Sequence, residues 1–116
     1  MNKVIVLALL TLATAANAAD RSAVDRGRKG YVEFGCAKCH GAAGQGSNSG
    51  LKLAPEVLPA DAIITFLRGT TGPMPRYGTE IMSDAQITDI HAYLESLPKP
   101  ASPDSIAALK NIRGKK

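Results

Sequence analysis

The chain contains two cysteines, and both lie in the short segment CAKCH at residues 36–40. Two thiols separated by two residues can form a disulfide, act as a redox pair, supply half of a zinc site, or add to the two vinyl groups on one edge of a porphyrin. In the last case the histidine that follows the second thiol is held beside the ring, where its imidazole can bind iron. These chemistries make different demands on the rest of the sequence.

Three of these alternatives leave something unexplained. A zinc site needs two ligands besides the two thiols, and outside this segment only His91 remains, so the set is one ligand short. A thioredoxin-like pair should follow a strand, and no stretch of the sequence indicates one. A plain disulfide gives His40 no role. Covalent attachment of one haem through Cys36 and Cys39, with His40 as an iron ligand, uses all three side chains.

The amino-terminal residues predict export. A short positive head ending at Lys3 leads into the apolar run 4–10, and the small residues 16–18 suit a signal peptidase. An uncleaved membrane anchor is the alternative, but the apolar run is well short of the roughly 20 residues that span a bilayer. We therefore expect a cleaved signal peptide at residues 1–18, a mature domain at residues 19–116, a periplasmic location and no stable membrane insertion.

Composition indicates one compact domain, since the 116 residues are 45% apolar and 21% charged. Loss of Lys3 with the signal peptide leaves 13 Lys and Arg against 10 Asp and Glu. The two propionates of a haem would lower this small positive charge further. Such a weak field does not favour binding to nucleic acid or to an anionic membrane.

All regular structure is expected to be helical. The first helix should cover residues 22–34, where Gly27 and Gly30 lower the propensity but permit close packing. Residues 41–50 are rich in turn formers and predict a loop. A second helix should cover residues 60–68 and end at Gly69.

The last main helix is expected to begin at a capping box formed by Ser83 and Gln86, and to run to about Leu97. Prolines at positions 98, 100 and 103 end it. The Pro-rich tail, residues 99–116, has room for a short amphipathic turn over residues 104–112.

Three residues are candidates for the second axial ligand of the iron: Met74, Met82 and His91. Met74 lies between Pro73 and Pro75, which restrict its backbone to an extended conformation and suit a side chain that must aim at a fixed metal. For Met82 and His91 we favour the structural roles of a core methionine and a partly exposed helix histidine. Met74 is the predicted ligand, because methionine opposite histidine is the usual arrangement for electron transfer.

Over essentially the whole mature chain, these features resemble the class I, single-haem cytochromes c. The resemblance implies an all-α cytochrome c fold, a small helical bundle around one covalently bound haem c, with the first and last helices crossing near Gly27 and Tyr93. It also implies that the carbonyl of Pro55 orients His40. The chain has few aromatic residues, so we expect burial of the haem against Leu53, Phe66 and Tyr77 to complete the core.

The predicted function is single-electron transfer by a carrier that is not itself an enzyme, since His40 and Met74 would fill both axial positions. The donor would be a respiratory donor or a periplasmic dehydrogenase. Size and tail are similar to those of short cytochrome subunits that serve flavoprotein or quinoprotein dehydrogenases. The alternative is a five-coordinate haem that acts as a gas sensor or small peroxidase. For Arg68 and Arg76, binding to haem propionates and exposure to solvent both remain open.

Overall fold

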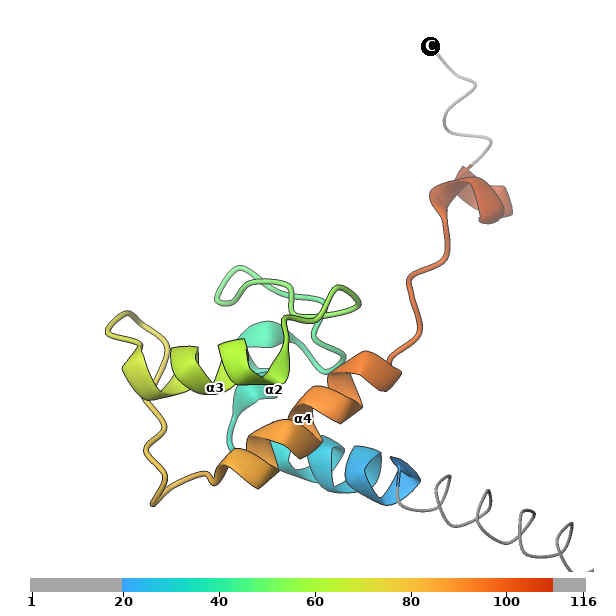
Figure 1. Cartoon of the computed structure of the whole chain (residues 1–116). Coiled ribbons are helices and arrows are strands. Elements are labelled where there is room, and N and C mark those ends of the chain that lie inside the picture. Colours follow the sequence, from blue (N-terminus) through green and yellow to red (C-terminus); the bar gives the residue numbers. More distant parts are fainter. Residues whose placement is uncertain (1–19, 110–116) are drawn as a thin grey trace, which may run out of the picture.

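The computed structural model describes residues 20–109, and within this range the regular structure is helical (Figure 1). Residues 20–33 form the first helix, followed by α2 (Cys36–His40), α3 (Ala60–Gly69), α4 (Asp84–Ser96) and the short 3-10 helix η1 (Pro103–Ser105). No strand occurs in this range, where an isolated bridge joins Ser47 and Gly50. The expected all-α fold is confirmed. The expected signal peptide at residues 1–18 lies outside the described residues.

The first helix packs against α4 at two glycines, as expected from the sequence. A Cβ built on Gly27 would overlap the carbonyl oxygen of Asp89 and lie 2.9 Å from Cβ of Tyr93. One turn later, a Cβ on Gly30 would lie 3.3 Å from the side chain of Ile90. The absence of side chains at these glycines lets the two backbones approach closely. The predicted crossing near Gly27 and Tyr93 is therefore present.

The start of α4 has the predicted capping box. The backbone N–H of Gln86 donates to Oγ of Ser83 over 3.2 Å, and the backbone N–H of Ser83 donates to Oε1 of Gln86 over 2.8 Å. These bonds satisfy two amide groups that the first helical turn would otherwise leave unpaired. The capping box therefore fixes where α4 begins.

The core of the described residues is small. Its buried apolar members are Tyr31, Ala54, Leu67, Met82, Ile87, Ile90, Tyr93 and Leu94, of which half belong to α4. Helix α3 contributes Leu67 and contacts α4 directly. The only buried polar residue in the described range is His40. A core of this size gives limited hydrophobic stabilisation for a domain of this length.

Beyond α4 the chain leaves the bundle. Figure 1 shows the segment with η1 extending away from the other helices. Ile106 and Leu109 in this segment are 40% and 39% exposed. The predicted tail turn is thus helical in part, and its residues after 109 lie outside the described range. No helix in the described part of the chain is long and apolar enough to cross a membrane.

Candidate haem-binding site

The segment CAKCH forms its own short helix, α2. Gly35 adopts a left-handed conformation (φ 82°) that turns the chain out of the first helix, and Gly41 (φ 80°) follows the last helical residue. Cys39 and His40 lie three and four residues after Cys36 in this helix. Side chains at this spacing share one face of a helix. The fold therefore places Cys36, Cys39 and His40 on the same side of α2.

The two thiols are free and differ in their surroundings. Cys36 is partly buried against the core, whereas Cys39 is exposed. Burial raises the pKa of the Cys36 thiol above its ordinary value. Redox-active CxxC pairs instead depend on a thiolate of lowered pKa. The environment of Cys36 thus disfavours a thioredoxin-like role and is compatible with covalent attachment of a cofactor.

His40 is buried, with 8% of its surface exposed, and one ring nitrogen is already engaged. Its Nδ1 lies 2.6 Å from the carbonyl oxygen of Leu51. A carbonyl only accepts, so Nδ1 carries the proton and the lone pair is on Nε2. This is the tautomer that a metal-ligating histidine adopts when a second group fixes its ring. The expectation that Pro55 supplies this carbonyl is wrong, because Leu51, four residues earlier, provides it.

The loop after α2 passes close to the His40 ring, and it can do so because Gly50 has no side chain. A Cβ on Gly50 would lie 2.6 Å from the carbonyl oxygen of Cys39 and 3.0 Å from Nδ1 of His40. Two hydrogen bonds hold the same loop against the end of α2. The N–H of Gly46 donates to the carbonyl of His40 over 2.8 Å, and the hydroxyl of Ser47 donates to that of Cys39 over 2.6 Å.

Two tyrosines at the crossing of the first helix and α4 form hydrogen bonds to the residues that directly follow His40. The hydroxyl of Tyr31 donates to the carbonyl of Gly41 over 2.8 Å, and that of Tyr93 donates to the carbonyl of Ala42 over 3.0 Å. The two rings lie 5.5 Å apart in a tilted arrangement. Burial raises the pKa of Tyr31 to about 12, with smaller contributions from Cys36 and Tyr93. The crossing of the first helix and α4 therefore also positions the chain directly after His40.

The three candidates for the second axial ligand have different surroundings. Met74 is partly buried and packs against the core cluster, as does Cys36. Met82 has no exposed surface, which suits the core role that we favoured for it. His91 lies on α4 with Nδ1 3.5 Å from a carboxylate oxygen of Glu95. Met74 thus remains the predicted ligand.

Partly buried apolar side chains pack against the buried core cluster. Besides Cys36 and Met74, the residues that pack against the core cluster include Leu53, Val57, Ile63, Ile64 and Tyr77. Two of the three side chains expected to cover a haem, Leu53 and Tyr77, belong to this set. The third, Phe66, is 55% exposed.

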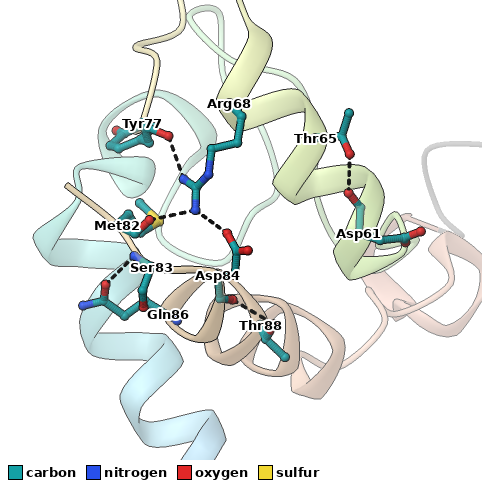
Figure 2. Close-up of polar contacts among 9 residues, drawn as sticks. All are labelled: Asp61, Thr65, Arg68, Tyr77, Met82, Ser83, Asp84, Gln86 and Thr88. Carbon is teal, nitrogen blue, oxygen red and sulfur yellow. Dashed lines mark hydrogen bonds and ion pairs between the residues drawn. The ribbon is translucent and has the colours of Figure 1, made fainter. Parts of the chain in front are cut away.

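Of the two roles expected for Arg68, free exposure to solvent does not hold, because its side chain is only 21% exposed. Its guanidinium donates to the carbonyls of Tyr77 and Met82 and to the carboxylate of Asp84 (Figure 2). Arg76 also bonds to the chain itself, since its Nε donates to the carbonyl of Arg68 over 2.7 Å. Sequence reasoning missed these contacts because most of the acceptors are backbone carbonyls, which every residue has.

The donor set fits a covalently attached haem: two thiols and an imidazole share one helical face, and the imidazole has its Nε2 lone pair free for a metal. The fold and the site thus define a c-type cytochrome. A family model described as cytochrome c oxidase, cbb3-type, subunit III, matches residues 22–94. The chain belongs to this family. Comparison with curated proteins and comparison with solved structures gave no significant match.

Membership of this family establishes the general chemistry. A cytochrome c domain holds haem c covalently and transfers electrons, and the pair Cys36 and Cys39 fits this attachment. Such a domain is an electron carrier and requires a redox protein as its partner.

Proposed function

We propose that the chain transfers single electrons through one haem c that Cys36 and Cys39 hold covalently and that His40 and Met74 ligate. The observation that carries the proposal is the 2.6 Å contact between Nδ1 of His40 and the carbonyl of Leu51, because it leaves Nε2 free for iron. Bound haem supplies an iron centre that changes its charge by one electron.

The protein residues hold and tune this centre. Thioether bonds from Cys36 and Cys39 prevent dissociation of the cofactor. The carbonyl of Leu51 fixes the His40 ring and increases the basicity of its free nitrogen. As a ligand, the thioether of Met74 would raise the reduction potential relative to a second histidine. Ligation by both His40 and Met74 would leave no place for a small molecule on the metal, as the role of a carrier requires.

The partner is proposed to be a flavoprotein or quinoprotein dehydrogenase or a respiratory donor, met in the periplasm after cleavage of residues 1–18. The description of the matched family names an oxidase subunit, so an oxidase is a further class of partner to consider. The weak net charge of the chain allows transient docking to any of these.

Carbon monoxide tests the axial ligation. The ferrous wild-type protein should not bind it readily at neutral pH, whereas the Met74→Ala variant should bind it. Absorption spectra of both proteins, recorded before and after addition of the gas, measure this difference. Ready binding by the wild type would contradict the carrier proposal and favour the five-coordinate gas sensor or peroxidase.

The partner and the location need a separate experiment. A carboxy-terminally tagged chain, loaded with haem, is isolated gently from the periplasmic fraction, and bound proteins are identified by mass spectrometry. A stoichiometric dehydrogenase would make the chain a fixed electron-accepting subunit, and a monomer would make it a diffusing carrier. The same spectra report the mature amino terminus, which we expect at Ala19. Recovery of an intact Met1 would contradict cleavage.

A further inference from the structure

The segment that joins α3 to α4, residues 70–83, carries Met74 and contains no helix. Its first part is closed into a loop by a backbone bond in which the N–H of Tyr77 donates to the carbonyl of Leu67 over 3.0 Å. Its second part is a turn in which the N–H of Met82 donates to the carbonyl of Gly78 over 3.0 Å. The position of Met74 therefore depends on what holds these two parts together.

Arg68 makes this connection (Figure 2). One terminal nitrogen of its guanidinium donates to the carbonyl of Tyr77 over 2.6 Å, and the other donates to the carbonyl of Met82 over 2.9 Å. The second nitrogen also pairs with the carboxylate of Asp84 in the first turn of α4. A single side chain at the end of α3 thus bonds to the closing residue of the loop, to the following turn and to the next helix.

The surroundings strengthen these bonds. The Arg68 side chain is only 21% exposed, so water competes weakly for its donors. Bonds between a guanidinium and its acceptors are charge-assisted and stronger than those between neutral groups. The donors form a rigid planar fork, which lysine cannot reproduce. Arginine at this position therefore restrains the loop in direction as well as in distance.

The same loop is connected to the helix end that precedes the haem-attachment motif. The hydroxyl of Tyr77 donates to the carbonyl of Phe34 over 2.6 Å, and the two rings pack edge to face with centroids 6.4 Å apart. Phe34 is two residues before Cys36. The bonds from Arg68 to Tyr77 therefore fix the loop that carries Met74 relative to the segment that carries the cysteines.

From these contacts we infer that Arg68 is a positioning residue for the Met74 ligand: its guanidinium closes the loop over residues 70–82 and so keeps the thioether on the iron. This inference rests on the proposed function, since it requires Met74 to be the ligand. Arg68 itself does not need to touch the haem.

The chain offers a matched control in Arg26. Its guanidinium also pairs with a carboxylate, through two nitrogens that lie 2.7 and 2.9 Å from the oxygens of Asp89. This pair joins the first helix to α4 and lies outside the segment 70–83 that carries Met74. An Arg26→Met variant loses the same kind of side chain and the same kind of ion pair. An effect that appears in Arg68→Met and not in Arg26→Met can therefore be assigned to the lost bonds between Arg68 and residues 70–83.

The experiment measures competition between imidazole and the methionine for the ferric iron in the haem-loaded protein. Imidazole binds only the fraction of molecules from which the thioether has left, so its apparent affinity reports this fraction. We expect Arg68→Met to bind imidazole about tenfold more tightly than the wild type, the effect of losing a charged hydrogen bond. Arg26→Met should match the wild type. The methionine-to-iron charge-transfer absorption should weaken in Arg68→Met and remain unchanged in Arg26→Met.

A second variant and a reference protein separate the outcomes. Arg68→Lys keeps the charge without the fork, and it should also bind imidazole more tightly even if Arg68→Met fails to fold. Equal imidazole affinity in Arg68→Lys, Arg26→Met and the wild type would overturn the inference. The Met74→Ala reference should lack the charge-transfer absorption. If that absorption survived in Met74→Ala, or were absent from the wild type, the proposed ligation itself would be wrong.

Discussion

The backbone of Gly27 in the first helix lies directly against the carbonyl of Asp89 in α4, so that no side chain fits between them. This contact brings Tyr31 and Tyr93 together beside the turn that follows His40. The helix crossing therefore determines the position of one side of the candidate haem site.

Replacing Gly27 with alanine should destabilise the protein by about 3 kcal/mol, the upper part of the range for overpacked cores, because the two helix backbones must separate. Gly69→Ala is the matched control, since a Cβ at Gly69 meets nothing within 4 Å. Urea unfolding of the haem-loaded proteins, followed by circular dichroism, measures both. A loss below about 0.5 kcal/mol for Gly27→Ala would show that the crossing tolerates a methyl group.

Stability should decrease at alkaline pH because of Tyr31. Its pKa is raised from 10.0 to about 12 by burial, so the folded state holds the phenolic proton more tightly than the unfolded state. This contribution is complete below pH 10 and is lost as the pH rises through about 12. The stability advantage of the wild type over Tyr31→Phe should therefore shrink across this range in urea titrations. A constant difference between the two proteins would contradict the assignment.

The features that could be predicted from the sequence are those that depend on particular side chains, or on their absence. The capping box depends on the hydroxyl of Ser83 and the amide of Gln86, and both are visible in the sequence. The helix crossing depends on the absence of a side chain at Gly27. The site motif likewise depends on residue types at fixed spacing, which α2 places on one face.

The contacts that could not be predicted have backbone groups as partners. The sequence does not show whether the carbonyl of Leu51 or that of Pro55 faces His40, since the path of the loop decides it. The contacts of Arg68 could not be predicted either, because two of its acceptors are the backbone carbonyls of Tyr77 and Met82. A family resemblance carries such a contact over only when the loop follows the same path.

Removing the amino-terminal cap of α4 should lower the stability of the protein moderately. Ser83→Ala leaves the backbone N–H of Gln86 without its acceptor and should lower the free energy of unfolding by about 1 kcal/mol. Ser83→Thr keeps a hydroxyl at the same position and should change it by only a few tenths of a kcal/mol. Thermal unfolding of the two haem-loaded variants compares them directly. Equal losses would mean that the hydroxyl does not act as a cap.

The chain without its haem should be largely unfolded, because its own apolar core is small. A variant with both Cys36→Ala and Cys39→Ala should lose covalent haem on a denaturing gel and most of its helical signal in circular dichroism. Single Cys→Ala variants keep one possible thioether bond and should retain covalent haem in part. Native helix content in the double variant would show that the apolar core folds alone.

Substitution of Met82 should change the stability of the protein, whereas substitution of Met74 should change the ligation of the iron. Met82 has no exposed surface, so Met82→Ala leaves a cavity and should cost about 2–5 kcal/mol in urea unfolding. Met82→Leu nearly conserves volume and should cost less than about 1.5 kcal/mol. This folded variant should still exclude carbon monoxide at neutral pH, in contrast to Met74→Ala. Binding of the gas by Met82→Leu, together with its exclusion by Met74→Ala, would instead identify Met82 as the iron ligand and Met74 as the packing residue.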